Sequence, residues 1–162
     1  MLRETYELAG MGPTTANSNP ARFVFLESEA AKARPSPLAL PSMSKRQRQR
    51  RSPLLSLGTP SFMKNSHGCF PTPTCVPILR ELIDETAFRN GSLHGGYFIL
   101  AARALGLDCG TMSGFDSAKV NAEFVPGGKW KVNFLCNLGY GDPGKLYPRN
   151  SRLKFEEACR LL

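Results

Sequence analysis

The sequence predicts an α+β fold, and three observations carry this prediction. Residues 22–26 contain an apolar run, residues 23–26, that is rich in β-branched and aromatic side chains, as strands are. Residues 92–105 repeat apolar side chains at helical spacing. Residues 130–138 alternate partly between apolar and polar side chains, which predicts a second strand. Helices and strands in this mixture are typical of a layered α+β or α/β domain.

The first part of the chain contains one predicted helix, one loop and one strand. Residues 2–9 have the apolar spacing of a helix. A Gly-Pro pair at residues 12–13 ends that helix, and a polar loop over residues 14–19 leads to the strand. Because residues 22–26 are densely apolar, we expect both faces of this strand to be buried.

The last part of the chain contains the longest predicted helix. Its pattern begins at residues 81–88 and continues over 92–105, where Gly106 is placed to end it. Residues 117–124 predict a short helix, with Asp116 or Ser117 as its N-cap.

Two further elements close the chain. A turn is predicted after the second strand, over residues 139–143, because glycine, aspartate and proline gather there. The last residues, 155–162, predict a short closing helix.

The segment between these parts has a composition of its own. No Asp or Glu occurs from residue 30 to residue 80, while eight prolines do. Nine basic residues lie in it: Lys32, Arg34, Lys45, Arg46, Arg48, Arg50, Arg51, Lys64 and Arg80. The rest of the chain has 12 basic against 13 acidic residues, so the net charge of +8 arises in this segment. Such a composition predicts disorder, because little apolar area is available for burial.

We therefore divide the chain into three parts. Residues 1–31 and residues 81–162 form the two parts of one folded domain, and residues 32–80 form a basic, disordered segment between them. No apolar run is long enough to span a bilayer, and the first ten residues lack the layout of a signal peptide. The five cysteines have no motif spacing, so disulfides are not implied. We expect a cytoplasmic protein without a membrane partner.

Two partner classes remain open for the basic segment on its residues alone. The cluster of residues 45–51 could attract nucleic-acid phosphates, although no aromatic platform accompanies it, so nucleic acid is an unfavoured partner. His67, Cys69 and Cys75 could donate zinc ligands, but a structural zinc site needs four. We therefore expect no metal site.

Several motifs on either side of the basic segment resemble a known family. They are residues 12–18, 20–25, 85–92, 101–110, 112–116 and 133–142. In this order they resemble the FMN-dependent nitroreductases. The match covers residues 2–31 and 82–162, and it is closest to the malonic semialdehyde reductases of pyrimidine (uracil) degradation.

The resemblance implies a fold and an activity. The family fold is an α+β, flavin-binding sandwich that forms a homodimer with FMN in two interfacial sites. NAD(P)H delivers hydride to the flavin, which passes it to a small-molecule substrate such as an aldehyde, a nitro compound or a quinone. In this branch, malonic semialdehyde would become 3-hydroxypropanoate. The cofactor carries the chemistry, so no catalytic side chain is named.

The resemblance also implies a set of flavin contacts. Pro13, Thr14, Thr15 and Asn17 occupy the family's flavin-binding loop, where hydroxyls and an amide suit the donors and acceptors on the ring edge. Without the resemblance, this loop is a Gly-Pro turn whose side chains satisfy their own backbone.

Two later motifs complete that set. Ser113 and Gly114 match a loop that runs along the flavin ring, and the same residues also suit a helix N-terminus. Arg149 and Arg152 match the basic pair that binds the FMN phosphate, because a guanidinium fork suits a phosphate dianion. Taken alone, the two arginines are solvated surface charges.

One histidine is a candidate acid. His94 lies in the predicted helix at residues 92–105, where the branch usually has glutamine. We expect a surface or interface residue rather than an acid catalyst. No Ser-His-Asp set or carboxylate pair can be assembled outside the basic segment.

The resemblance also suggests an origin for the basic segment. Codons for residues 42–77 can be chosen so that reading two bases later gives a segment similar to the family's middle region. We therefore hypothesise that this stretch is out of frame and that the frame returns near residues 78–82. The family's N-terminal region, which would precede residue 2, is expected to be absent.

These departures lead to a second set of expectations. The stabilising free energy lost with a central strand would exceed the net stability of an intact domain, about 5–15 kcal/mol. The chain is therefore expected to bind FMN poorly or not at all. The alternatives to an active FMN oxidoreductase are an inactive, incomplete fragment and, less favoured, a nucleic-acid-binding protein.

Overall fold

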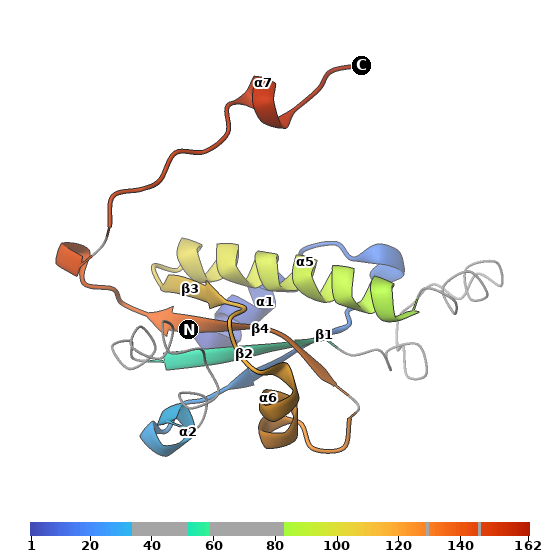
Figure 1. The fold of residues 1–162 in the computed structure, drawn as a ribbon, viewed down its shortest axis with the longest axis vertical. Helices are drawn as coiled ribbons and strands as arrows, with labels where there is room; N and C mark the ends of the chain where they lie inside the picture. The colour runs from blue at the N-terminus through green and yellow to red at the C-terminus, as the bar shows by residue number, and fades with distance from the viewer. Residues whose placement is uncertain (34–51, 59–82, 129, 146) are drawn as a thin grey trace.

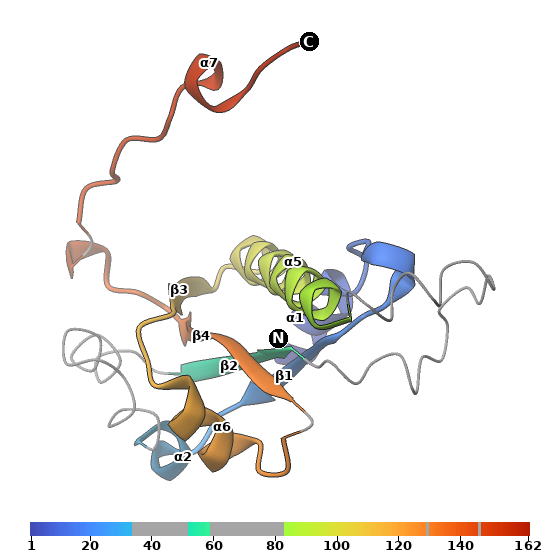
Figure 2. The same ribbon diagram turned by 45° about the vertical axis from the view of Figure 1, so that its right-hand side comes forward.

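The fold is a four-stranded antiparallel sheet with helices on both faces (Figures 1 and 2). It is seen in a computed structural model, which describes residues 1–33, 52–58, 83–128, 130–145 and 147–162. The strands are β1 (Ala21–Phe25), β2 (Ser52–Gly58), β3 (Asp108–Met112) and β4 (Lys131–Gly139). Their order across the sheet is β1-β2-β4-β3, so β1 and β3 form its two edges.

The helices are divided between the two faces of the sheet. The helix α1 (Leu2–Ala9) and the long helix α5 (Ile83–Ala104) cover one face. The helix α6 (Ser117–Phe124) packs on the other, and α2 (Glu29–Ala33) lies on that side too (Figure 2). Short turns of 3-10 helix, η1 (Thr15–Asn17) and η4 (Pro143–Lys145), and the helix α7 (Phe155–Ala158) complete the described elements.

The apolar core is built on both faces of the sheet. On the α5 side, Phe98 is almost fully buried and its ring stacks on Phe23 of β1, with 4.8 Å between ring centroids. On the α6 side, Val120 and Leu135 are the centre of a smaller cluster. The amide of Asn121 also accepts a hydrogen bond from the Val132 N–H at 2.7 Å, which fixes α6 against β4.

Several sequence predictions are confirmed. The helix at residues 2–9, the helix at 117–124 and the strand near 130–138 all form. The two helical patterns at 81–88 and 92–105 are one continuous helix, α5. Gly106 follows that helix with φ of +85°, a conformation that glycine adopts without strain.

Three elements differ from the predictions for the folded parts. The strand β1 lies at an edge and is only partly buried, whereas we expected both faces to be covered. The strand β3 was not predicted, because its sequence, Asp-Cys-Gly-Thr-Met, is poor in strand-forming side chains. The closing helix is shorter than predicted, since only Phe155–Ala158 is helical.

The strand β2 differs from the prediction for the basic segment. It lies within residues 32–80, yet its backbone pairs with β1 on one side and with β4 on the other. Ladder hydrogen bonds join backbone groups, so composition does not exclude a strand. Pro53 lies beyond the part of β2 that pairs with β1. The central position, which we expected to be empty, is therefore occupied.

Two other predictions for the basic segment concern residues that the structure does not describe. The basic cluster at residues 45–51 and the candidate zinc ligands His67, Cys69 and Cys75 lie outside the described residues. Within the described part of the chain, no group of three or more potential metal ligands occurs. None of the described helices is both long and apolar enough to cross a membrane.

Candidate functional site

The loop before β1 is fastened to the long helix α5. The N–H of Thr15 donates to Oδ1 of Asn90 at 2.7 Å, and the hydroxyl of Tyr97 donates to the carbonyl of Pro13 at 3.0 Å. Asn90 is buried, and its own amide nitrogen donates to the Thr86 carbonyl at 2.9 Å. Its orientation is thus set from both ends, and the loop has a rigid support.

A glycine makes this close approach possible. A side-chain carbon at Gly12 would overlap the ring of Tyr97. Tyr97 can reach the Pro13 carbonyl because Gly12 leaves that space open. The Gly-Pro pair therefore ends the first helix and also seats the loop on α5.

The loop itself has an unusual backbone. Ala16, Asn17 and Asn19 all have positive φ, at 50°, 52° and 44°. Such conformations are costly for residues other than glycine, although asparagine tolerates them best. The amide of Asn19 donates to the carbonyl and to the side-chain oxygen of Asn17, at 3.0 and 2.9 Å, and its N–H donates to Thr14 Oγ1 at 3.2 Å. These local bonds hold the strained turn in one shape.

A second candidate segment joins β3 to α6. Ser113 is exposed, Gly114 is half-buried, and the Ser113 carbonyl accepts a hydrogen bond from the Phe115 N–H at 3.0 Å. Asp116 caps α6, since its carboxylate accepts from the Lys119 N–H at 3.1 Å. This hydrogen bond lowers the pKa of the Asp116 carboxyl, and the Lys119 ammonium adds to the effect.

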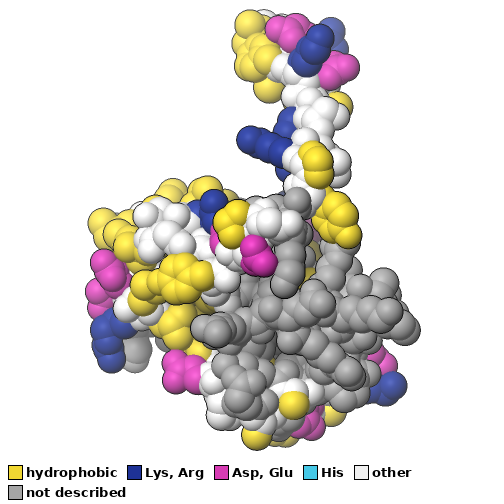
Figure 3. Space-filling view, turned by 90° about the vertical axis from the view of Figure 1, so that its left-hand side faces the viewer, with side chains coloured by type: hydrophobic (Ala, Val, Ile, Leu, Met, Phe, Trp, Pro, Cys, Tyr) yellow, Lys and Arg dark blue, Asp and Glu magenta, His cyan; other side chains and the backbone are white. Residues whose placement is uncertain are grey.

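The third candidate segment lies in an arm that leaves the body after β4 (Figure 1). Arg149 and Arg152 are exposed on this arm. Arg152 donates to two neighbouring carbonyls, those of Asn150 at 2.9 Å and Ser151 at 3.3 Å. Figure 3 shows basic and apolar side chains along the arm, where Tyr147 and Leu153 are also exposed.

The three candidate segments do not meet within one chain. The loop of η1 precedes one edge strand, β1, whereas Ser113 and Gly114 follow the other edge strand, β3. The arm that carries Arg149 and Arg152 points away from both (Figures 1 and 2). A ligand that touches all three would need groups from more than one copy.

The position of His94 corrects our expectation of a surface residue. Only 3% of this residue is exposed, and its ring packs edge-on against Phe23 with 5.7 Å between ring centroids. Neither ring nitrogen has a hydrogen-bond partner among the described residues. Burial lowers the pKa of the imidazole, and the nearby Arg22 charge lowers it further. Its contact with the Phe23 ring favours burial of the imidazole.

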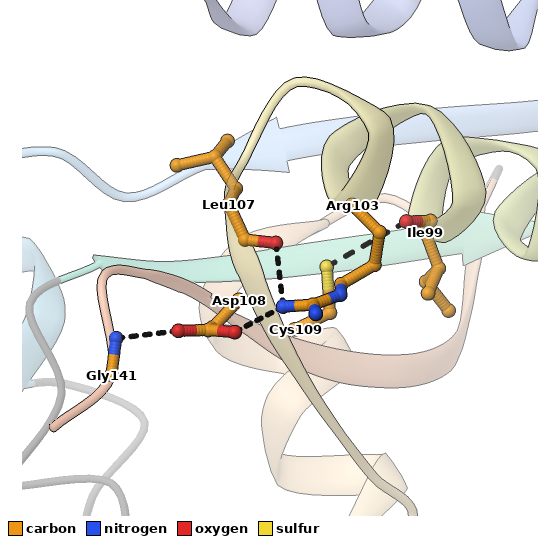
Figure 4. A network of polar contacts seen from close by, with 6 residues as sticks. All are labelled: Ile99, Arg103, Leu107, Asp108, Cys109 and Gly141. Atoms are coloured by element: carbon orange, nitrogen blue, oxygen red, sulfur yellow. Dashed lines mark hydrogen bonds and ion pairs between the residues drawn. The ribbon is translucent and has the colours of Figure 1, made fainter. Parts of the chain in front are cut away.

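A polar network joins α5, β3 and the start of the arm (Figure 4). Arg103 pairs with the Asp108 carboxylate and donates to the Leu107 carbonyl at 3.3 Å. The other carboxylate oxygen of Asp108 accepts from the Gly141 N–H at 2.7 Å. The end of the helix and the end of β4 are therefore held by one carboxylate.

Sequence reasoning missed three supporting residues: Asn90, Tyr97 and Asp108. Asn90 and Tyr97 carry polar atoms on a helix whose prediction depends only on its apolar spacing. Asp108 lies two residues after Gly106, which ends that helix, in a stretch without a predicted element. A signal was present, because a buried asparagine in a helix needs partners for its amide.

Comparison with known proteins identifies the family. A model of the "Nitroreductase family" matches residues 1–140. The chain belongs to the nitroreductase family. It is 47% identical over 165 residues to the "Putative NADH dehydrogenase/NAD(P)H nitroreductase RSc1004" of Ralstonia nicotianae, with 100% of this chain and 85% of the relative covered. A relative of the same name in Rhodopseudomonas palustris is 48% identical, with 99% and 84% covered.

Solved structures of this family share the fold. A nitroreductase family protein from Streptococcus pneumoniae superposes with a TM-score of 0.83 at 20% identity, and 99% of this chain and 88% of that chain are covered. A "putative nitroreductase in complex with FMN" from Exiguobacterium sibiricum gives a TM-score of 0.81 at 18% identity, with 99% and 85% covered. The nitroreductase-like α+β fold predicted from the sequence is thus confirmed.

Proposed function

We propose that this nitroreductase-family chain is an FMN-dependent NAD(P)H oxidoreductase. Family membership supports the proposal, as do relatives at 47% and 48% identity that are named NAD(P)H nitroreductases. A solved structure of the same fold is a complex with FMN. The single structural observation behind it is the loop of η1, whose strained shape is held against α5 at Asn90 and Tyr97.

The residues present fit FMN in two ways. A flavin ring edge presents donors and acceptors, and the loop of Pro13, Thr14, Thr15 and Asn17 offers hydroxyl, amide and backbone groups in a fixed arrangement. A phosphate is bound well by guanidinium groups, and the side chains of Arg149 and Arg152 are exposed. Ser113 and Gly114 are the proposed contacts along the ring.

The division of labour follows from these groups. A bound FMN would supply the transfer of hydride from NAD(P)H to the second substrate. The loop would orient the ring, because Asn90 accepts from the Thr15 N–H and Tyr97 donates to the Pro13 carbonyl. The arginines would neutralise the phosphate. No catalytic side chain is required in this scheme, and none is assigned.

We further propose malonic semialdehyde as the substrate, reduced to 3-hydroxypropanoate in pyrimidine degradation. The support is the resemblance to that branch of the whole set of motifs on either side of the basic segment. Reduction of the aldehyde adds a hydride to the carbonyl carbon and a proton to its oxygen. We also propose a cytoplasmic location, which would suit that metabolic role, and small-molecule partners rather than nucleic acid or membrane.

We propose a homodimer as the active form. The flavin contacts assigned above lie at opposite edges of the sheet and on a projecting arm, so one chain does not assemble them. A second copy would bring its own arm and edge strand to the loop. Leu93 and Leu100 on the outer side of α5 are exposed, and a dimer would cover apolar side chains of this kind.

The test is purification of the full chain with added FMN, followed by gel filtration and flavin analysis. Because β2 occupies the central position that we expected to be empty, we expect about one FMN per chain in a dimer-sized peak rather than poor FMN binding. We also expect oxidation of NADH or NADPH that depends on malonic semialdehyde. Asn90→Ala should lower FMN retention, because the Thr15 N–H loses its acceptor, while Asn90→Asp keeps an oxygen at that position. Rates with a nitroaromatic compound and a quinone rank the substrates.

The alternatives give different results in the same experiment. An inactive fragment would elute without flavin and would not oxidise NAD(P)H above the background rate. A nucleic-acid-binding protein would instead bind a DNA duplex with an affinity that falls steeply as salt rises. Bound FMN with turnover of a nitroaromatic compound but not of malonic semialdehyde would support the proposed oxidoreductase activity. It would reject malonic semialdehyde as the substrate.

A further inference from the structure

A buried histidine lies between the two contacts that fasten the loop of η1, residues 13–19, to α5. His94 follows Asn90 by four residues and precedes Tyr97 by three, so the three side chains share one face of the helix. Asn90 and Tyr97 each form a hydrogen bond with the loop. The state of His94 therefore bears directly on both contacts.

The imidazole of His94 is buried without a polar partner. Only 3% of the residue is exposed, and neither ring nitrogen is hydrogen-bonded within the part of the chain that the structure describes. The ring instead packs edge-on against Phe23 of β1. A charged imidazole in this place would have two N–H donors and no acceptor, which is far more costly than burial of the neutral ring. The packing therefore favours the neutral form.

Arg22 is the charged residue that acts on His94. It precedes Phe23 on β1, and its positive charge lowers the pKa of the imidazole, as burial does. Its guanidinium also donates to the Asn19 carbonyl at 3.0 Å, at the end of the loop of η1. A second positive charge on His94 would repel Arg22 and would disturb the loop from its β1 side as well as from α5.

The other elements packed against α5 do not offset this charge. Burial and Arg22 are the influences that set the pKa of His94, so no described carboxylate favours its proton. Residues 52–58 of β2 include no titratable side chain. Arg3, Glu4 and Glu7 of α1 are exposed, Asp108 of β3 pairs with Arg103, and Lys131 of β4 pairs with Asp84.

We propose that His94 is a positioning residue of the flavin site: its neutral ring keeps the loop of η1 fastened to α5, and a proton on the ring releases the loop together with its flavin. This role rests on the proposed function, because the loop is taken as part of the FMN site. The proton comes from solvent when the loop opens and returns to solvent before the loop closes. The step is a reversible protonation in which no other bond is made or broken.

The size of the effect follows from the ordinary pKa of histidine. In the open loop the imidazole meets water and titrates near pH 6.5. In the closed loop its pKa is lower, because of burial and Arg22. Lowering the pH from about 7.5 to about 5.5 therefore shifts the ratio of open to closed loop by up to about tenfold towards the open form.

Amide hydrogen exchange of the full chain measures this opening. The Thr15 N–H donates to Asn90 Oδ1 at 2.7 Å, so it exchanges when the loop leaves α5. The Val132 N–H is the matched reference, because it donates to Asn121 Oδ1 at 2.7 Å on the α6 side of the sheet. Both amides are followed by NMR at each pH, with and without FMN, after correction for the intrinsic pH dependence of exchange.

We expect the protection of Thr15 to fall by up to about tenfold between pH 7.5 and pH 5.5 in the wild-type chain. Thr15 should also be less protected than Val132 at both pH values, because opening of the loop is local. His94→Phe and His94→Gln should both abolish the pH dependence of Thr15. One side chain is apolar and the other is polar, so a shared result is due to the missing charge.

Release of FMN is the second measurement. The chain is loaded with FMN at pH 7.5, and dissociation is followed after dilution at pH 7.5 or 5.5. A phosphate monoester has a second pKa of about 6, so the cofactor itself contributes to the pH dependence. We therefore compare the wild-type chain with His94→Phe, and we expect the wild-type dissociation rate to rise several-fold more as the pH falls.

Three results would overturn the proposal. The first is a protection of Thr15 that does not change with pH in the wild-type chain, which requires no variant to fold. The second is equal protection of Thr15 and Val132 at both pH values, because the loop would then be released only by global unfolding. The third is a wild-type pH profile in His94→Phe, for either exchange or FMN release.

Failure of the proposed function has a different signature. A chain without bound FMN at pH 7.5 would reject the FMN site and, with it, the release of flavin by His94. The exchange of Thr15 does not need flavin, so it would still decide whether His94 holds the loop.

Discussion

The carboxylate of Asp108 accepts a hydrogen bond from the Gly141 N–H at 2.7 Å, and this contact ties the start of β3 to the segment that leaves β4. The two residues are 33 positions apart in the sequence. Arg103 pairs with the other oxygen of the same carboxylate. The arm with Arg149 and Arg152 therefore begins from a fixed point on the sheet.

Asp108→Ala should lower the free energy of unfolding by about 1–2 kcal/mol, since the Gly141 N–H and Arg103 both lose their acceptor. The carboxylate is partly exposed, so water limits the loss. Asp108→Asn is the matched control, because an amide oxygen can still accept from Gly141. Urea denaturation of the three chains measures the effect, and equal midpoints for wild type and Asp108→Ala would contradict it.

Gly141→Ala tests the same contact from the other side. A side-chain carbon at Gly141 would lie 2.8 Å from the Asp108 carboxylate oxygen, so the hydrogen bond would have to lengthen. We expect a loss of about 1 kcal/mol in unfolding free energy. In an Asp108→Ala background, the same substitution should cost much less, because the clash is gone. A double-mutant cycle without coupling would reject this account.

Gly12→Ala should loosen the loop of η1, because its new side chain overlaps the Tyr97 ring. We expect lower thermal stability and weaker FMN binding. Gly96→Ala on the same helix as Tyr97 is the matched control, since nothing lies within 4 Å of the added carbon. Alanine in a helix interior is favoured over glycine by about 0.5–1 kcal/mol, so this variant should be at least as stable as wild type. A Gly12→Ala chain with unchanged flavin affinity would count against the seating role.

Periodicity explains which elements could be predicted. The helices α1, α5 and α6 and the strand β4 each show their buried face in the spacing of apolar residues. The strand β3 shows no such pattern, since its order depends on pairing with β4 rather than on its own side chains. The strand β2 likewise depends on pairing, because its hydrogen bonds join it to β1 and β4, which are distant from it in the chain.

The candidate site divides in a similar way. Pro13, Thr14, Thr15 and Asn17 could be proposed because their loop resembles a family motif, and their placement on α5 needed the structure. The burial of His94 could not be predicted, since a single polar residue in an amphipathic helix does not reveal which face it occupies. The partners of Asn90 and Asp108 depend on contacts between distant segments, which local sequence does not encode.

The coding DNA tests our hypothesis on residues 42–77. Absence of acidic residues from 30 to 80 is unusual in a chain whose other parts have balanced charge. We expect a nucleotide read across the codons for residues 27–85 to show compensating insertions or deletions around a family-like second frame. A read that confirms the present frame, without a family-like alternative, would reject the hypothesis and make the basic cluster at residues 45–51 the next candidate for a partner.

The buried imidazole of His94 should make stability depend on pH. Burial and Arg22 hold its pKa below the ordinary 6.5, so the unfolded chain binds a proton more readily than the folded chain. The stabilising contribution is therefore complete above pH 6.5 and is lost as pH falls through the lower pKa of the folded state. We expect the urea midpoint to fall between about pH 7.5 and about pH 5.5, where histidine is the main titrating side chain.

His94→Phe should remove most of this pH dependence, because a phenyl ring fills a similar space beside Phe23 and carries no proton. The orphaned ring nitrogens disappear as well, so stability at neutral pH should be close to that of wild type or above it. His67→Gln, at the only other histidine of the chain, is the control and should keep the slope. If His94→Phe retained the wild-type pH dependence, the titrating group would lie elsewhere and His94 would be an inert core residue.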